Sequence, residues 1–384
     1  MPLRFRSCML LINPTRHPRM VDRLTRKLEN SHGIEVVVTE SKEHFRRCAR
    51  EFFLSSYENL LVWGGDGTAH DAINVIYPFV EEFHGGEGPR KAVGFLRGGT
   101  GNGIQDSYEV PYRLSAQLAS YARSMRNGYR IDVDLLRVDD GRRTRYGQLV
   151  GVGFDADILV LRERRVAGGR QSGARSGVTK YLSAGIRHFL SYDFGRDRAN
   201  YDLELADGKY AFHGPRVNAQ FPIHRLTMRR SPLMIEVGTR PYYGKLFKVC
   251  PDVVCNDGDM NVYLFDFSSK WEIVRNSAYI WTGRHSMINR TLSRARKPVI
   301  ERYEVKHTRI GRDSPFAYHI DGELLHAGTP LSEGCYGIDI EILPQALTFL
   351  VPAQFYHIFH PFTENPDVPD VKHEPEGADA VGGV

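Results

Sequence analysis

Along the first third of the chain, short apolar runs alternate with longer segments in which apolar residues recur every three or four positions. The short runs are typical of buried strands, and the longer segments are typical of amphipathic helices. We predict strands at residues 7–12, 34–39, 59–63 and 92–96, and helices at residues 19–30, 42–54, 69–77 and 114–125. The helix at 69–77 should end before Pro78, because proline has no backbone N–H. The alternation predicts an α/β domain, with a parallel sheet flanked by helices on both faces.

After residue 132, short strand-like runs separated by Gly, Pro and Asp-Gly pairs dominate the chain. We predict strands at residues 146–152, 201–205, 233–237, 261–266, 305–310 and 316–320, and helices at 180–190 and 271–281. These runs indicate a second, β-rich domain. We therefore divide the chain into an α/β domain (1–133), a β-rich domain (134–348), a C-terminal strand that returns to the first domain (349–360) and a disordered acidic tail (361–384).

The composition is that of an ordinary globular protein, since 41% of the 384 residues are hydrophobic and 25% are charged. No apolar run approaches the roughly 18 residues that a membrane-spanning helix needs. The five cysteines include no Cys-x-x-Cys pair, which favours a reducing compartment without a disulfide framework. We expect a cytoplasmic protein; the sequence does not indicate its oligomeric state.

Charge is distributed unevenly along the chain. Residues 364–384 hold six acidic residues and one lysine, so the rest of the chain is more basic than the net charge of +5 suggests. A basic body favours anionic partners such as nucleotide phosphates or an acidic membrane surface, although it can also serve solubility alone. Six cations at 162–180 surround a Gly- and Ser-rich stretch, and we hypothesise that this segment contacts anionic lipid. A solvated basic loop is the alternative.

Two glycine clusters carry the candidate chemistry: Gly-Gly-Asp-Gly-Thr at 64–68 and Gly-Gly-Thr-Gly-Asn-Gly at 98–103. Each follows a predicted strand and precedes a helix, where unpaired N–H groups and the helix dipole favour anions. Either cluster alone could be a tight turn. Together, at the carboxyl ends of neighbouring parallel strands, they predict one phosphate-binding crevice. It is neither a dinucleotide fingerprint, because Ile104 stands where glycine is needed, nor a Walker loop, because no Gly-Lys-Ser/Thr occurs.

The two clusters resemble the catalytic domain of the diacylglycerol kinase family, which includes bacterial soluble lipid kinases and sphingosine and ceramide kinases. NAD kinases are distantly related to it. Further motifs occur in the family's order between residues 7 and 352: Asn13-Pro14, Arg130-Ile131-Asp132, Gly153-Phe154-Asp155-Ala156, Asp257-Gly258, Asp321-Gly322-Glu323 and Leu350-Val351-Pro352. The resemblance implies an NAD kinase/diacylglycerol kinase-like α/β domain followed by a β-rich lipid-substrate domain.

The resemblance also implies an activity: transfer of the γ-phosphoryl group of ATP to a lipid hydroxyl, with Mg²⁺, at a membrane surface that the protein contacts peripherally. No nucleic-acid partner is expected. The nucleotide would lie on Asn13, Thr39, Gly64, Gly65, Asp66, Gly67, Thr68, Gly99, Thr100 and Asn102. Such a site suits phosphoryl transfer, which needs positioning and charge neutralisation more than covalent help.

The resemblance assigns the remaining chemistry to acidic residues. Glu323 would be the general base, Asp321 would assist by hydrogen bonding or metal contact, and Asp66 would bind Mg²⁺ or orient the acceptor hydroxyl. Asp-Gly at 321–322 is also a common two-residue hairpin signal, which is compatible with an active-site role.

The family's second, structural Mg²⁺ would be bound by Asp257, Asp259 and the backbone carbonyl of Val254, although two of the family's carboxylates are Asn256 and Asn261 here. A simple turn is the alternative at that position.

The sequence restricts the identity of the phosphoryl acceptor only in part. Leu159 replaces an aspartate that pairs with the lipid amine in sphingosine kinases, so a neutral acceptor such as diacylglycerol is favoured, although Asp155 or Asp157 could substitute. The chain lacks the Asn-Glu pair that NAD kinases use for ribose. The alternatives are a sphingoid-base or ceramide kinase, a kinase of NAD or another soluble metabolite, and a non-catalytic nucleotide-binding protein, which the cationic loop after Asn13-Pro14 makes conceivable.

Overall fold

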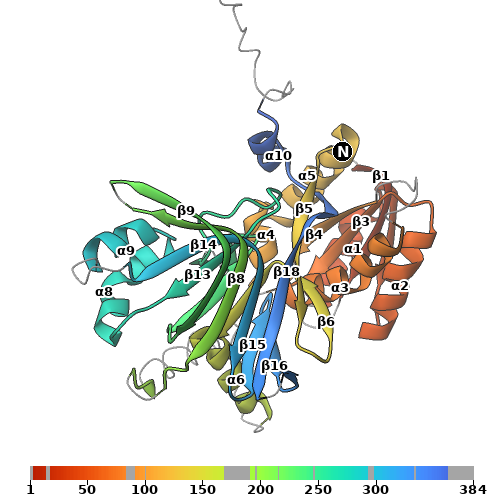
Figure 1. The fold of residues 1–384 in the computed structure, drawn as a ribbon. Helices are drawn as coiled ribbons and strands as arrows, with labels where there is room; N and C mark the ends of the chain where they lie inside the picture. Colours follow the sequence, from red (N-terminus) through yellow and green to blue (C-terminus); the bar gives the residue numbers. More distant parts are fainter. Residues whose placement is uncertain are drawn as a thin grey trace, which may run out of the picture.

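The computed structural model describes residues 3–13, 18–83, 91–99, 101–167, 191–194, 197–214, 216–244, 247–292, 298–332 and 334–361. Among them, 16 strands form one continuous mixed sheet, and a two-stranded ribbon accompanies it. Figure 1 shows the N-terminal strands and helices on one side of the molecule and the long antiparallel strands on the other.

The N-terminal part is a parallel sheet in the order β2 (His32–Val38), β1 (Arg4–Ile12), β3 (Asn59–Gly64) and β4 (Ala92–Arg97). Its helices are α1 (Pro18–Leu28), α2 (Lys42–Leu54), α3 (Asp66–Phe83), the short α4 (Gly103–Ser107) and α5 (Leu114–Asn127). All six residues of β3 are buried, as expected for an inner strand of a sheet with helices on its faces. The predicted α/β domain is confirmed.

The β-rich part begins with β5 (Arg130–Asp139), β6 (Thr144–Gly147), β7 (Leu149–Gly153) and helix α6 (Phe154–Ala167). Its further strands are β8 (Tyr201–His213), β9 (Asn218–Arg230), β10 (Met234–Gly238), β13 (Met260–Phe265), β14 (Ile300–Arg312), β15 (Phe316–Ile320), β16 (Glu323–Ala327), β17 (Pro330–Ser332) and β18 (Cys335–Leu350). The ribbon is β11 (Tyr242–Gly244) with β12 (Phe247–Lys248), and the remaining helices are α8 (Lys270–Trp281), α9 (His285–Leu292) and α10 (Ala353–Phe359).

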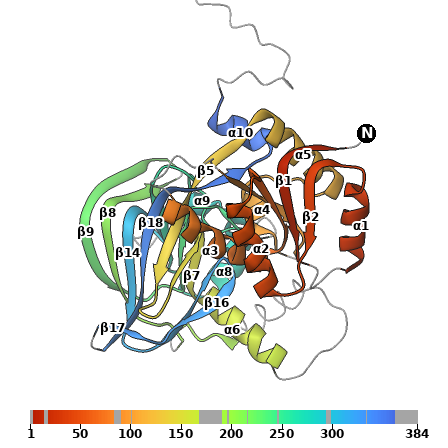
Figure 2. The ribbon, with the colours of Figure 1, turned by 90° about the vertical axis from the view of Figure 1, so that its right-hand side faces the viewer.

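Two long strands join the two parts. β18 pairs with β14 in the β-rich part, and its last residues reach the N-terminal sheet, where Phe349 lies beside Val93 of β4. β5 runs antiparallel to β18 over most of that length. Figure 2 shows β5 and β18 between the N-terminal strands and the curved strands β8, β9 and β14. The sheet edge that carries the glycine turns is therefore connected by backbone hydrogen bonds to the β-rich part.

Several predicted elements differ from the structure. α3 continues past Pro78 to Phe83, because Pro78 lies on the exposed side of the helix while Ile76 and Tyr77 remain packed in the core. The strand predicted at 146–152 is broken at Gln148, whose backbone N–H turns to the carboxylate of Asp321. The stretch 353–359, predicted as part of a strand, is helix α10.

Three other predictions concern residues that the structure does not describe. The helix predicted at 180–190, most of the basic segment 162–180 and the tail from 362 onward lie outside the described residues. None of the helices in the described ranges combines the length and hydropathy that a membrane crossing requires.

Candidate active site

The two glycine turns lie against each other at the carboxyl ends of β3 and β4. A Cβ atom built on Gly99 would be 2.3 Å from the Cα of Gly65, so neither position has room for a side chain unless the backbone moves. The backbone N–H of Gly98 donates to the carbonyl of Gly64 at 2.8 Å, and the side chain of Thr68 packs directly over Gly64. The sequence predicted a single crevice at this edge, and the two turns do converge.

Asp66 links the two turns. Its Oδ1 accepts hydrogen bonds from the backbone N–H groups of Gly103, at 2.6 Å, and Ile104, at 3.4 Å, so the carboxylate of the first turn lies at the start of α4. A Cβ on Gly101 would be 2.2 Å from Oδ2, so the second turn closes over this carboxylate as well. Burial raises the pKa of Asp66, and the guanidinium of Arg240 together with the two N–H groups opposes that rise.

The remaining predicted nucleotide residues lie along the same edge of the sheet. The amide of Asn13, after β1, donates to the hydroxyl of Thr68 at 3.3 Å. Thr39, after β2, is buried, and its hydroxyl donates to the carbonyl of Ile12. Asn102 has a left-handed backbone, and its side-chain amide exchanges two hydrogen bonds with the backbone of Gly99, which fixes the shape of the second turn. Thr100 lies outside the described residues.

A third turn, Asp321–Gly322, joins β15 to β16 as a two-residue hairpin loop with positive φ at both positions. The hairpin that the sequence suggested is therefore present, and it lies at the site. Glu323 follows the loop, is exposed, and has its Oε2 3.8 Å from the position that a Cβ on Gly67 would take. The candidate base therefore lies over the first turn of α3.

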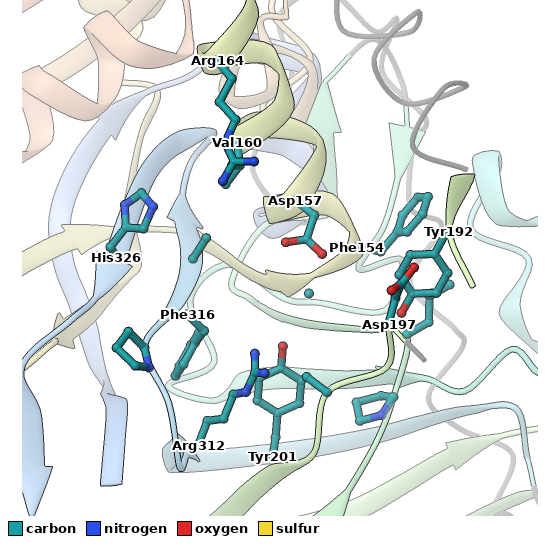
Figure 3. A pocket seen from close by; sticks show the side chains of 16 residues that line it. Phe154, Asp157, Val160, Arg164, Tyr192, Asp197, Tyr201, Arg312, Phe316 and His326 are labelled. Atoms are coloured by element: carbon teal, nitrogen blue, oxygen red, sulfur yellow. The ribbon is translucent and has the colours of Figure 1, made fainter. Parts of the chain in front are cut away.

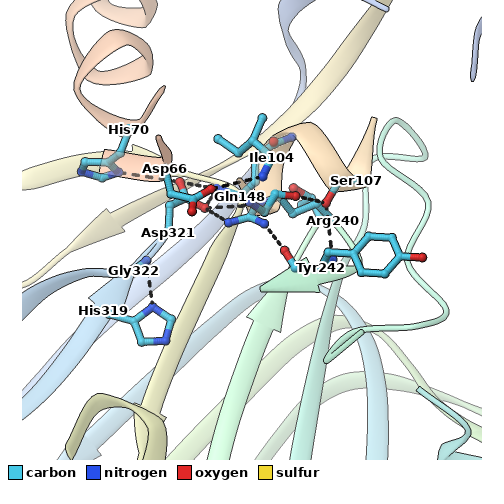
Figure 4. Close-up of polar contacts among 12 residues, drawn as sticks. Asp66, His70, Ile104, Ser107, Gln148, Arg240, Tyr242, His319, Asp321 and Gly322 are labelled. Atoms are coloured by element: carbon cyan, nitrogen blue, oxygen red, sulfur yellow. Dashed lines mark hydrogen bonds and ion pairs between the residues drawn. The ribbon is translucent and has the colours of Figure 1, made fainter. Parts of the chain in front are cut away.

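Asp321 is buried under this turn and is held by three groups (Figure 4). The guanidinium of Arg240 donates to Oδ1 at 3.0 Å, the backbone N–H of Gln148 donates to the carboxylate at 3.2 Å, and Nδ1 of His70 lies 3.6 Å from Oδ2. Burial alone would raise the pKa of Asp321, but Arg240 and His70 outweigh it and hold the pKa below its ordinary value. Asp321 is thus an anionic anchor in the protein interior.

Sequence reasoning missed Arg240 and His70. Arg240 follows β10, and its guanidinium also donates to the carbonyl of Tyr242. No local pattern marks it, because its partner lies 81 residues away in the chain. His70 is in the first turns of α3, immediately after the glycine turn, and that position was the one available signal.

The predicted second metal site does not fit a metal ion. The ammonium of Lys306 donates to the carbonyl of Gly258 at 2.8 Å and to Asp259 at 2.9 Å, so the chain places its own cation on this turn. The Oδ1 of Asp257 accepts the backbone N–H of Asp259. Asn261, which replaces one of the family's carboxylates, accepts a hydrogen bond from Arg302 instead. The simple-turn alternative describes this segment better.

A cavity of about 290 Å³ lies beside the β15–β16 hairpin (Figure 3). Asp157 and Arg164 of α6 form one side of it, and Tyr201 and Arg312 lie opposite. The other lining residues are mainly aromatic or apolar: Gly153, Phe154, Val160, Tyr192, Asp197, Ala199, Pro232, Leu233, Pro315, Phe316, Ala317 and His326. The cavity contacts the hairpin at Phe316, Ala317 and His326, at the end away from the turn that carries the candidate base.

Comparison with known proteins gives two family matches. Residues 7–138 match the diacylglycerol kinase catalytic domain, and residues 149–351 match the YegS C-terminal NAD kinase beta sandwich-like domain. A Schizosaccharomyces pombe protein, sphingoid long chain base kinase 4, is 29% identical over 136 residues, which are 34% of this chain and 28% of that protein. The similarity thus spans less than a third of that relative's length.

Solved structures share the fold at low identity. A diacylglycerol kinase structure from Bacillus anthracis str. Sterne gives a TM-score of 0.54 at 14% identity, covering 91% of this chain and 98% of that chain. A second structure from the same organism, of a protein provisionally named a diacylglycerol kinase, gives 0.58 at 16% identity, with 91% and 97% covered. The second family match covers more than half of the chain, and the two matches follow the order of the two structural parts. The chain belongs to the diacylglycerol kinase catalytic-domain family, with a β-sandwich C-terminal domain of the YegS type.

Proposed function

We propose that this chain is an ATP-dependent lipid kinase that transfers the γ-phosphoryl group of ATP to the hydroxyl of a neutral lipid such as diacylglycerol. One observation carries the proposal: the two glycine turns pack against each other, and Glu323 from the third turn lies over Gly67. Phosphoryl transfer depends on holding the phosphates and the acceptor in line, and three converging turns supply the required supports.

The backbone N–H groups of Asp66 and Gly67 at the start of α3 would hold the phosphates of ATP, since those of Gly98, Gly99 and Gly103 donate within the protein. Asp66 fits a hard divalent cation, because it is a carboxylate with Oδ1 fixed on α4 and Oδ2 beside Gly101. Mg²⁺ held there would neutralise charge on the phosphates. The bonds from Gly103 and Ile104 keep this carboxylate oriented before any ligand arrives.

Glu323 would accept the proton of the lipid hydroxyl, because it is exposed and lies over the phosphate-binding turns. Asp321 is a positioning residue in this proposal, since it is buried and paired with Arg240. The cavity beside the hairpin would hold part of the lipid, and its lining combines aromatic rings with the charged side chains Asp157, Arg164, Asp197 and Arg312.

A sphingoid-base kinase is the second candidate function, and two observations favour it. The S. pombe relative is named as a kinase of such bases. The cavity lining also includes the carboxylates of Asp157 and Asp197, which could pair with a lipid amine.

Labelled ATP supplied with a panel of acceptors tests these functions directly. Vesicles containing diacylglycerol, sphingosine or ceramide are incubated with the protein and Mg²⁺, and NAD is tested in solution. Label in diacylglycerol is the expected result. Label in sphingosine alone would favour the second candidate, label in NAD would contradict a lipid kinase, and ATP binding without turnover would refute catalysis.

The variant Asp66→Asn tests the role of the site in turnover without a change in fold stability. The new amide keeps an oxygen for the N–H of Gly103 but loses the charge, so we expect turnover to fall by about 100-fold or more with unchanged thermal unfolding. Asp71→Asn is the matched control, because Asp71 lies on the same helix and pairs with Lys42 at the surface. Wild-type turnover in Asp66→Asn would contradict our assignment of the site.

A further inference from the structure

Three buried titratable side chains lie behind the hairpin turn: Asp155, Glu236 and His319. Glu236 of β10 and His319 of β15 are both in register with Gly151 of β7, the strand between them. A Cβ on Gly151 would lie 2.1 Å from the Oδ2 of Asp155 and 2.2 Å from the Nε2 of His319. The glycine therefore leaves the space into which α6 inserts the carboxylate of Asp155.

The hydrogen bonds of this cluster determine where its protons lie. The backbone N–H of Gly322 donates to Nδ1 of His319 at 3.4 Å (Figure 4), so the ring proton of neutral His319 is on Nε2. Nε2 lies 2.5 Å from Oδ2 of Asp155, which accepts that proton's hydrogen bond. The side chain of Glu236 bonds to Asp155 as well.

The charges agree with this assignment. Burial, and then the neighbouring Asp155, raise the pKa of Glu236 well above its ordinary value, so Glu236 keeps its proton and donates it to Asp155. Burial would also raise the pKa of Asp155, but His319 outweighs it and lowers that pKa. Asp155 is therefore the ionised carboxylate of the cluster, and it accepts hydrogen bonds from His319 and Glu236.

The chain of bonds ends on the turn that carries the candidate base. β16, which begins with Glu323, is the terminal strand of the sheet, and within the described part of the chain only β15 pairs with it along its backbone. The turn is held on one side through Asp321, by Arg240 and Gln148. On the other side it is held by the ring of His319, through the N–H of Gly322.

We propose that Asp155, Glu236 and His319 are positioning residues, which fix the 321–322 turn and thereby the place of Glu323 over Gly67. This inference rests on the kinase function proposed above. It assigns no contact with substrate to the three residues. Their effect is on how often Glu323 occupies the reactive position, and therefore on kcat rather than on the binding of ATP.

Asp155→Asn is the principal test. The new amide offers one acceptor oxygen where the carboxylate offers two, so it cannot accept from both His319 and Glu236 as Asp155 does, and one of these contacts is lost. We expect kcat to fall about 10- to 100-fold, with KM for ATP changed less than about twofold. Asp140→Asn is the matched control: Asp140 is also buried and accepts from Tyr318, next to His319 in sequence, but has no bond to the turn.

A pair of His319 variants tests which ring nitrogen matters. The side-chain oxygen of His319→Asn can stand near Nδ1 and accept from Gly322, whereas His319→Phe has no acceptor there. We expect kcat to be higher for the Asn variant than for the Phe variant. ¹⁵N NMR of the wild-type imidazole should show Nδ1 as the nitrogen without a proton, and this measurement does not depend on turnover.

Each outcome bears on one proposal or the other. Wild-type kcat in Asp155→Asn, or an equal loss in Asp140→Asn, would overturn the positioning role while the kinase function stands. Failure of the wild-type protein to phosphorylate any acceptor would refute the kinase function itself and, with it, this role. If the purified wild type held a stoichiometric divalent metal that Asp155→Asn lost, the cluster would be a metal site and not a hydrogen-bonded network.

Discussion

Replacing Arg240 with methionine would test the ion pair on which the third turn rests. The guanidinium lies 3.0 Å from Asp321 Oδ1, and the two side chains are 1% and 0% exposed. Methionine fills part of the same volume but leaves the carboxylate with only the N–H of Gln148 and the ring of His70. Removal of one partner of a buried pair costs about 3–5 kcal/mol, because the other charge remains buried without compensation. We expect a loss of that size in the free energy of unfolding near neutral pH.

The variant should also change how stability depends on pH. In the wild type the pKa of Asp321 is below its ordinary value, so its stabilisation is complete at neutral pH and is lost only as the pH falls through that low pKa. Without Arg240, burial is no longer outweighed, and the pKa of Asp321 should lie above its ordinary value. The variant should then lose stability as the pH rises through the new pKa, and its deficit should shrink toward about pH 4.

Urea unfolding of both proteins between about pH 4 and pH 8 measures this difference. The double variant Arg240→Met/Asp321→Asn is the control, because removing both charges should recover part of the stability that the single variant loses. A single variant that loses less than about 1 kcal/mol would refute our reasoning, and so would a deficit independent of pH. Either result would mean that water or another cation reaches Asp321.

Three further predictions concern the other turns. Chelation of divalent cations should leave the urea unfolding midpoint of the wild type unchanged, because Lys306 supplies the cation at 257–259. The variant Lys306→Ala should lose about 1 kcal/mol in its free energy of unfolding, and its unfolding midpoint should become sensitive to Mg²⁺. Destabilisation of the wild type by EDTA would contradict this prediction. Gly99→Ala should abolish ATP binding in calorimetry, since its Cβ would meet the first turn at 2.3 Å, while Gly328→Ala, where a Cβ meets nothing, should bind normally. Glu323→Gln should lower kcat by about 100-fold or more without changing thermal stability, because the side chain is exposed; unchanged kcat would exclude it as the base.

The local features of the N-terminal part could be predicted from the sequence. The bounds predicted for α2 agree with the structure, because Ser41 caps the helix by accepting from the N–H of His44 and the apolar spacing continues to Leu54. The glycine turns could also be placed, because each directly follows a buried strand. Parallel strands then bring their carboxyl ends to one edge, so the convergence of 64–68 and 98–103 follows from topology.

Features that depend on distant partners could not be predicted. β9 was missed because the alternation of Ala219, Phe221 and Ile223 with polar residues breaks before Leu226 and Met228, and none of its residues is buried. The strand predicted at 305–310 is only part of β14, which extends to Ile300 and Arg312 through pairing with β8, β13 and β18. Nor does any spacing along the chain indicate that Lys306 would lie at the turn where the sequence suggested a metal.

The Asp-Gly-Glu motif had two interpretations, a hairpin loop and part of an active site. In the structure it is a hairpin loop that lies at the candidate active site. A two-residue loop with positive φ at Asp321 and Gly322 places two carboxylates, only two positions apart, in opposite environments. Asp321 is sealed against Arg240, where it can stay ionised but cannot meet a substrate, and Glu323 is exposed over Gly67. The hairpin thus separates an anchor from a candidate base. That separation requires Arg240, which follows β10, and Gln148, which lies between β6 and β7, to meet the loop. It therefore depends on the register of the β-rich sheet rather than on the motif alone.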